Sequence, residues 1–388
     1  RQSDAILFVT YYNHAFSHAD SEFLVQLGRV KDAFEMDKMF FIVNAIDLAE
    51  SEEDASDVLA YVRANLARFG IKRPRLHAVS SLAILKEKLA GEHRGTQFEN
   101  AFHHFIFHDL AGLAVRAAEG DYARAQTLLS RLIEESEESA EKKAERRESL
   151  EKNAARAKDI LEKESSEGIE KRAAQEQAEL LYYVAERVFL RYEDMFRLSF
   201  NAATLGREHG KASLQKAMKE LLASLGFDLA QEMRATAVRL ERFLAKRGKE
   251  MQETLAKTLS EGERDFSFGV EATEFDFDLS FPTAFADVEP QVFAKELALF
   301  KSPAQFFEKG GSKIMAEALK ERLRPMVSAY LEREGARLEE RVLSGSRAVF
   351  EAALAHVRRE AQGYYEGHRA ALAGGLSAAK LREIRAKL

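Results

Sequence analysis

The chain has 388 residues, no cysteine and a net charge of −6, from 58 lysine and arginine residues against 64 aspartate and glutamate residues. The absence of cysteine excludes disulfides and cysteine-based metal sites. The nearly balanced charge argues against a nucleic-acid partner, because such proteins usually carry a basic excess. Only five prolines and 21 glycines interrupt a composition rich in helix formers. These totals predict a mainly helical protein with two or three domains.

Residues 1–95 differ from the rest because short apolar runs alternate with helical patterns. The runs lie at 5–10, 38–44 and 75–80, and each is typical of a strand in a buried parallel sheet. The apolar positions of the helical patterns between them are Phe23, Leu24, Leu27, Val30 and Phe34, then Val58, Leu59, Val62, Leu66 and Phe69. This alternation predicts part of an α/β sheet. Three strands are few for such a sheet, so we expect the missing strands to precede Arg1.

From residue 96 the pattern is helical nearly to the end. Residues 131–180 are rich in charged residues and alanine, which predicts a solvated long helix or a coiled coil. Apolar residues then recur at helical spacing through 181–255 and again through 326–357. Such stripes need partner helices, so an antiparallel helical bundle is predicted.

One segment, residues 265–311, interrupts the helices. It holds ten of the 27 phenylalanines and three of the five prolines. Residues 275–281 alternate apolar and polar side chains, which predicts an exposed extended strand. Because the segment lies between two long helical arms, we expect it at a tip of the bundle. The predicted division of the chain is therefore 1–95, 96–264, 265–311 and 312–388.

A candidate base-binding site follows the second predicted strand, in the sequence Asn44-Ala45-Ile46-Asp47. The carboxylate of Asp47 matches the paired N–H donors that guanine presents and adenine lacks. Asn44 is expected to tie neighbouring loops together. The third strand ends in Val79-Ser80-Ser81, where backbone N–H groups can meet the guanine oxygen. The alternative is that Asp47 and Ser81 only cap the helices that follow them.

Phosphate chemistry has no motif in this sequence. The pattern G-x-x-x-x-G-K-[ST] is absent, and so is a D-x-P-G magnesium motif. The nearest look-alike, residues 206–213, has the wrong glycine spacing and no preceding strand. We predict no catalytic residue here and no GTP hydrolysis by these residues alone.

A metal site is conceivable at His104 and His108, which are one helical turn apart. No third ligand is evident beside them, so a helix that links two domains is the favoured interpretation and no metal site is predicted.

Four stretches of the sequence resemble the bacterial dynamin-like proteins, in particular the tandem type found in Bacillus. They are residues 4–17 (DAILFVTYYNHAFS), 23–31 (FLVQLGRVK), 37–48 (DKMFFIVNAIDL) and 299–309 (LFKSPAQFFEK). The resemblance implies the C-terminal part of a GTPase domain at 1–95, a helical neck and trunk at 96–264, a membrane-binding paddle at 265–311 and returning helices at 312–388.

The same resemblance implies that GTP binds at Asn44, Ala45, Asp47, Val79, Ser80 and Ser81, with Mg²⁺ held by a part before Arg1. Ala45 departs from the family, which has a lysine at this position whose stem covers one face of the guanine. The loss of that stem is expected to weaken nucleotide affinity.

Residues 291–330, which begin in the 265–311 segment, carry the candidate membrane contacts, in which phenylalanines are flanked by lysines. They are Phe300, Lys301, Phe306, Phe307, Lys309 and Lys313. Aromatic rings flanked by lysines suit shallow insertion among lipid headgroups. The alternative is that these rings pack against the trunk.

Two functions remain open at this stage. The first is a dynamin-like large GTPase that binds and remodels membranes, self-associates through its head and stalk, and lies in the cytoplasm on the inner face of the cell membrane. The second is a non-enzymatic, self-assembling helical scaffold whose GTPase part is degenerate.

Overall fold

The computed structural model describes residues 5–16, 20, 23–24, 39–68, 71, 73–90, 96–205, 210–263, 265–273, 275–300, 303–307, 310–375 and 377–388. The chain divides into two compact units, each assembled from segments far apart in the sequence. The first, here the sheet unit, comprises Arg1–Ile160, Leu255–Val270 and Arg358–Leu388. The second, the bundle unit, comprises Leu161–Thr254 and Glu271–Val357. The boundary predicted at residue 95 lies inside the sheet unit.

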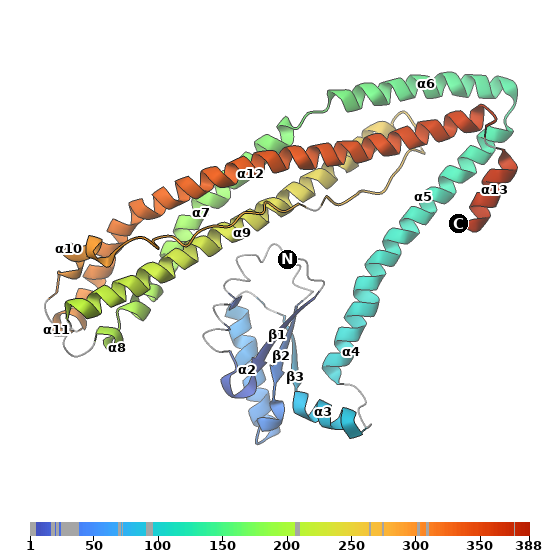
Figure 1. Cartoon of the computed structure of the whole chain (residues 1–388). Coiled ribbons are helices and arrows are strands. Elements are labelled where there is room, and N and C mark those ends of the chain that lie inside the picture. Colours follow the sequence, from blue (N-terminus) through green and yellow to red (C-terminus); the bar gives the residue numbers. More distant parts are fainter. Residues whose placement is uncertain are drawn as a thin grey trace. The chain divides into compact units, whose positions relative to one another are not determined.

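Three parallel strands form the sheet in the order β1 (Ile6–Tyr11), β2 (Met39–Asn44) and β3 (Arg75–Val79) (Figure 1). The central strand β2 is buried along nearly its whole length, as expected for a parallel strand covered on both faces. The rest of the described chain is dominated by helices. The predicted fold class, mainly helical with a partial α/β domain, is therefore confirmed.

Each face of the sheet has its own helical cover. Helix α2 (Glu52–Arg68) buries Val62 and Leu66 against one face. On the other face, Phe40 lies at the centre of an aromatic cluster in edge-on ring contacts. Its partners come from α4 (Gln97–His104) and the π-helical turn η5 (Phe105–Leu110), and are Phe98, Phe102 and Phe105. A capping box made by Thr96 and Glu99 fixes the start of α4.

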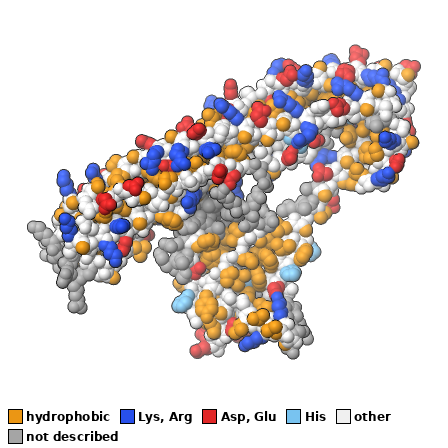
Figure 2. Space-filling view, viewed as in Figure 1, with side chains coloured by type: hydrophobic (Ala, Val, Ile, Leu, Met, Phe, Trp, Pro, Cys, Tyr) orange, Lys and Arg blue, Asp and Glu red, His pale blue; other side chains and the backbone are white. Residues whose placement is uncertain are grey.

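Strand β1 lacks cover on the face where α4 packs against β2. The side chains of Leu7, Val9 and Tyr11 are 45%, 54% and 47% exposed there. Figure 2 shows hydrophobic side chains gathered over the part of the unit that contains the sheet. An uncovered row of this kind is unusual for a parallel sheet, because such sheets are normally packed on both faces.

The remaining helices of the sheet unit meet around a small apolar cluster. Helix α5 (Ala111–Glu137) packs against α13 (Ala378–Lys387) and the end of α12 (Gly311–Leu372). The buried members of the cluster are Leu132, Ile133, Ala371 and Leu381. Helix α6 (Ala140–Lys163) also belongs mostly to this unit, as does the short helix α3 (Ser81–Ala90).

The bundle unit is built on three long helices, α7 (Glu167–Ser199), α9 (Lys211–Ser260) and α12. Their apolar stripes meet in one large buried core. The hydroxyl of Tyr192 on α7 donates to the carbonyl oxygen of Ala316 on α12 at 2.9 Å. Burial, together with the charge of Glu317, raises the pKa of Tyr192, so the hydroxyl remains a donor.

Buried charges join α7 to α9. Arg191 donates to Asp228 at 2.8 Å and to Glu232 at 2.7 Å, and Arg187 donates to Glu232 at 2.8 Å. Asp228 and Glu232 are both buried. Because an unpaired buried carboxylate is costly, these contacts fix the register of the two helices.

Residues 271–285, here called the strap, were predicted to include an exposed strand, and that prediction is wrong. The strap is extended and runs along α9 and α12 (Figure 1) without forming a strand in the part of the chain that the structure describes. The alternation of residues 275–281 is real, but Phe277 and Phe281 point into the core and are buried. Extended chain lying on a helical surface buries every second side chain in the same way as a sheet.

Two glycines on the long helices make room for the strap. A Cβ atom on Gly226 of α9 would lie 1.9 Å from the carbonyl oxygen of Ala284. A Cβ atom on Gly345 of α12 would lie 2.5 Å from the ring of Phe275. The strap is therefore held directly against the backbone of both helices.

Short helices complete the bundle unit. They are α8 (Ala202–Leu205), η6 (Pro290–Phe293), α10 (Ala294–Leu297) and α11 (Pro303–Phe307). Most of the helix predicted from Phe23 to Phe34 lies outside the described residues. Among the helices that are described, none combines the length and apolar character needed to cross a bilayer.

Replacing Gly226 with alanine is expected to destabilise the bundle unit by about 1–3 kcal/mol, because the new methyl group displaces the strap. Chemical denaturation measures the change. The matched control is Gly363→Ala in α12, where nothing lies within 4 Å of the added atom. That variant should be neutral or gain up to about 1 kcal/mol, and equal losses in both variants would contradict the role given to Gly226.

Candidate nucleotide-base site

The candidate site lies at the carboxyl edge of the sheet, where β2 and β3 end side by side. Asn44 is the last residue of β2 and pairs in register with Val79, the last residue of β3. The side chain of Val79 is buried beneath this edge of the sheet. Ligands of open parallel sheets bind at this edge, because the strand ends and the following loops converge there.

The side chain of Asn44 links the two strand ends. Its Oδ1 accepts a hydrogen bond from the backbone N–H of Ser81 at 3.1 Å and another from the Ser81 hydroxyl at 2.9 Å. The prediction that Asn44 ties neighbouring loops is confirmed. Ser81 is the first residue of α3, whose first N–H groups have no partner inside the helix. Asn44 thus caps α3 from a different strand.

The alternative interpretation was that Asp47 and Ser81 cap the helices that follow them, but other residues do so. Helix α3 is capped by Ser80, whose hydroxyl accepts from the N–H of Ala83 at 3.1 Å. Helix α2 is capped by Ser51, whose hydroxyl accepts from the N–H of Asp54 at 3.1 Å. Neither Asp47 nor Ser81 fills a capping role, so the capping interpretation is wrong for both residues.

Asp47 lies in the short 3-10 turn η4 (Ile46–Leu48), and its side chain is exposed. Within the described part of the chain, its carboxylate has no hydrogen-bond or ion-pair partner. The turn is set by Ala45, which adopts a left-handed conformation with φ 60 and ψ 38. Such a conformation is uncommon for alanine and is found preferentially at functional sites. The arrangement leaves a free carboxylate at the strand ends, with both of its oxygens open to a ligand.

The charged and titratable groups described on β3 are His77 and Arg75. Burial lowers the pKa of His77 on β3, and the nearby Arg75 guanidinium lowers it further. Arg75 lies over the rings of Phe40 and Phe105 and pairs with Asp109 at 3.8 Å. Among the six predicted base-site residues, Asp47 is the one acidic residue.

Comparison with known proteins gives one decisive similarity. The chain is 30% identical over 344 residues to "Dynamin-like protein A" of Bacillus subtilis (strain 168). The matched region covers 86% of this chain. The chain is a relative of the bacterial dynamin-like proteins. No family model matches the sequence.

The chain spans 28% of the length of this Bacillus relative. The activity, substrates and partners of a whole dynamin-like protein are therefore proposals for this chain.

The predicted membrane contacts of the dynamin-like chain fall into different surroundings. Phe306 is 0% exposed and lies among the rings of Phe196, Phe300 and Phe307. Phe300 is half-buried against the same core. Phe307 is 42% exposed and Lys313 is exposed. Lys301 and Lys309 lie outside the described residues. Phe306 is therefore a core residue of the bundle unit and not a surface contact, whereas Phe307 and Lys313 are exposed.

Ile314 is a surface residue that the sequence pattern did not reveal. It is 57% exposed next to Lys313, whereas its neighbour Met315 is fully buried. In the sequence, Ile314 looks like a member of the apolar stripe of α12. Only the rotation of the helix about its axis shows that it faces outward.

The two histidines considered for a metal site lie on α4 and η5. His104 and His108 lie 4.7 Å apart between ring centroids, and His104 lies 3.9 Å from Asp109. No group of three or more ligating side chains with metal-binding geometry occurs among the described residues.

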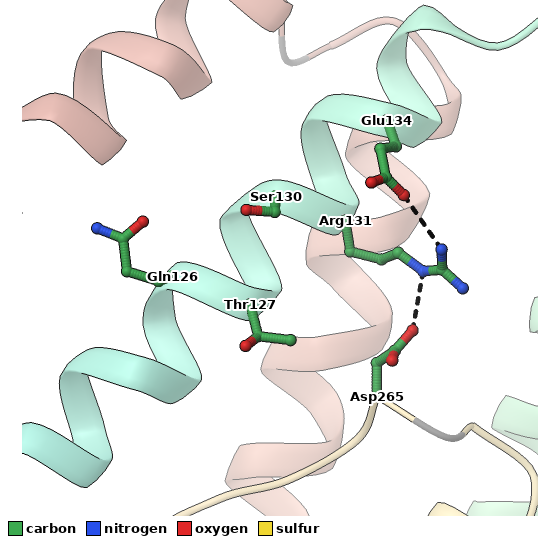
Figure 3. A pocket seen from close by; sticks show the side chains of 6 residues that line it. All are labelled: Gln126, Thr127, Ser130, Arg131, Glu134 and Asp265. Carbon is green, nitrogen blue, oxygen red and sulfur yellow. Dashed lines mark hydrogen bonds and ion pairs between the residues drawn. The ribbon is translucent and has the colours of Figure 1, made fainter.

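A surface pocket of about 420 Å³ lies beside α5, away from every predicted site residue (Figure 3). Its polar lining consists of Gln126, Thr127, Ser130, Arg131, Glu134 and Asp265. Arg131 donates to Glu134 at 3.1 Å and to Asp265 at 2.8 Å, so its charge is already neutralised. The pocket therefore shows no free charged group that selects a ligand.

Replacing Asn44 with alanine removes the acceptor for both Ser81 donors, so the amide of Ser81 is expected to exchange with solvent at least tenfold faster. Amide exchange followed by NMR measures this. Asn44→Asp keeps an acceptor oxygen and should retain most of the protection. Unchanged exchange at Ser81 in Asn44→Ala would show that the tie is not formed in solution.

Proposed function

We propose that the chain is the base-recognising and membrane-contacting part of a dynamin-like GTPase. The observation that carries this proposal is the free carboxylate of Asp47 at the carboxyl edge of a parallel sheet, beside the Asn44–Ser81 tie. The similarity to a dynamin-like protein over most of the chain supports it independently.

Guanine recognition follows from the chemistry of this edge. The N1–H and N2–H groups of guanine form a pair of donors, which one carboxylate accepts with two parallel hydrogen bonds. Adenine has no such pair, so Asp47 discriminates against it. The loop of Ser80 and Ser81 lies on the next strand end and supplies backbone N–H groups for the guanine O6. Asn44 keeps that loop at a fixed distance from Asp47.

Phosphate binding and hydrolysis belong to a part of the protein that these 388 residues do not supply, because no phosphate-binding loop occurs in the sequence. The uncovered row of Leu7, Val9 and Tyr11 supports this division. β1 is an edge strand in the described sheet, so its free edge can pair with a further strand, and the exposed row of side chains can be covered by a helix. Mg²⁺ would be bound together with the phosphates.

The bundle unit is proposed to contact a lipid surface through Phe307, Lys313 and Ile314. An exposed ring and an exposed aliphatic side chain beside an ammonium group suit the boundary between headgroups and acyl chains. The proposed location is the cytoplasmic face of the bacterial membrane, where self-association of the head and stalk couples nucleotide state to membrane remodelling.

The second candidate function is a non-enzymatic helical scaffold. Ala45 favours it, because a one-carbon side chain covers little of a purine face. A scaffold would self-associate equally with and without GTP or lipid, whereas a dynamin-like GTPase would not. Sedimentation of the intact protein under both conditions separates these functions.

Replacing Asp47 with asparagine should change the preferred base from guanine to xanthine. The amide of asparagine donates a hydrogen bond, and xanthine has an acceptor oxygen where guanine has an amino group. Saturation-transfer NMR with guanosine, xanthosine and adenosine at millimolar concentration tests the base contact without the phosphates. The wild type should favour guanosine, and Asp47→Asn should lose that preference at least tenfold. Asp57→Asn, the same change in α2, is the control. Equal guanosine binding by all three proteins would exclude the site.

Replacing Phe307 with serine should reduce flotation with vesicles of phosphatidylglycerol and phosphatidylethanolamine at least threefold, because the exposed ring no longer enters the headgroup layer. Leu190→Ser is the matched control, since Leu190 is also exposed but lies on the outer side of α7. Phe306 is avoided because it is a core residue. Flotation that drops equally in both variants, or in neither, would remove Phe307 from the proposed surface.

A further inference from the structure

A buried polar network joins four segments of the sheet unit. Its centre is Arg146 on α6, which donates through Nε to Glu135 on α5 at 3.0 Å and through both terminal nitrogens to Glu263, at 3.2 and 2.7 Å. Glu263 lies in the turn after α9. Both carboxylates are buried, with 4% exposed surface each.

The fourth segment is the C-terminal end of α12, which enters the network through two side chains. Nδ1 of His368 lies 2.5 Å from Oε2 of Glu135, and the hydroxyl of Tyr364 lies 3.4 Å from Oε2 of Glu263. His368 is fully buried. Since a carboxylate only accepts, the hydrogen of this contact is on Nδ1 of His368.

Burial alone would raise the pKa of Glu135, but the hydrogen bonds and charges of His368 and Arg146 outweigh it and lower the pKa below its usual value. Glu135 is therefore ionised at neutral pH, and its charge is what His368 and Arg146 are arranged around. Burial alone would lower the pKa of Arg146, but its hydrogen bonds to Glu263 and Glu135 and their charges raise it.

The network lies among apolar contacts of the same segment. A small cluster of Leu132, Ile133, Ala371 and Leu381 joins α5, α13 and the end of α12. Tyr364 is also buried, with its ring edge-on to that of Phe266. The attachment of residues 358–388 thus combines apolar packing with buried charge, and the charge is the part that a single protonation can remove.

The network is also incompletely satisfied. Nε2 of His368 is buried and has no hydrogen-bond partner among the described residues. Buried ion pairs of this kind are rarely the most stable filling of a core, and removing one charge from them is strongly destabilising. A junction built in this way is sensitive to the loss of a single proton acceptor.

We propose that this network is a releasable clasp, which holds residues 358–388 on α5 and α6 while Glu135 is ionised and lets that segment detach when the charge is lost. The groups that face His368 are Glu135 from α5 and Tyr364 from its own helix, with Arg146 from α6 and Glu263 from the turn in direct contact with those two. Low pH is one trigger that removes the charge.

The direction of the pH effect follows from the lowered pKa of Glu135. A carboxyl group with a lowered folded-state pKa stabilises the clasp fully above its unfolded value, which is near 4.5. That stabilisation is lost as the pH falls through the lower, folded-state pKa. The clasp is therefore closed at neutral pH and opens in acid.

The test is hydrogen exchange with mass spectrometry on the full chain, comparing wild type with Glu135→Gln at pH 7. We expect exchange across 358–388 to rise at least tenfold in the variant, while residues 211–254 of α9 stay protected. The matched control is Glu151→Gln, because Glu151 of α6 pairs with Arg369, the neighbour of His368 on α12, but at the surface. The control should exchange like the wild type.

A second measurement follows the wild type from pH 7 down to pH 3, after correction for intrinsic exchange, because the stabilisation is lost only below about pH 4.5. Loss of protection confined to 358–388 supports the clasp. Three results would overturn it: equal exchange in Glu135→Gln and wild type, equal effects of the two variants, or simultaneous loss of protection across the bundle unit.

Discussion

The bundle unit depends on one constraint, which is that none of its long helices can remain in water alone. Each of α7, α9 and α12 carries an apolar stripe over most of its length, and together they bury one continuous core. Individual helices gain little from their own hydrogen bonds, so the stability of this unit comes from the seam between them. The buried pairs of Arg187 and Arg191 with Asp228 and Glu232 then select one register of that seam.

The sheet unit is held together by a smaller apolar core and by polar side-chain contacts. Its sheet is closed by α2 on one face and partly by α4 on the other, and its strand ends are held by a side-chain tie rather than by packing. Asn44 is important because it performs two tasks at once. It caps α3, and it fixes the distance between the loop of Asp47 and the loop of Ser81. A change at either loop is therefore transmitted to the other through one amide.

Much of this organisation was accessible from the sequence, and the exceptions have physical causes. Strand positions and the tie made by Asn44 could be predicted because parallel strands and their ends have strong local patterns. The strap could not, because a period of two fits a strand on a sheet as well as extended chain on a helical bundle. Phe306 and Phe307 are neighbours with the same side chain, yet one is a core residue and the other faces outward. Only the packing of the bundle separates them. The network around Glu135 joins Glu135 and Arg146 to residues more than a hundred positions away, so no local pattern indicated it.

The two glycines under the strap fix the positions at which the strap contacts α9 and α12. Gly345 accepts the ring of Phe275 and Gly226 accepts the backbone of Ala284, so the chain between these two points must have one particular length. Insertions and deletions among relatives should therefore be excluded from 275–284 and accumulate in the turns that follow it. Relatives that lack one of the glycines should have rebuilt the strap itself. The two helices therefore set the length of a segment that has no regular secondary structure of its own.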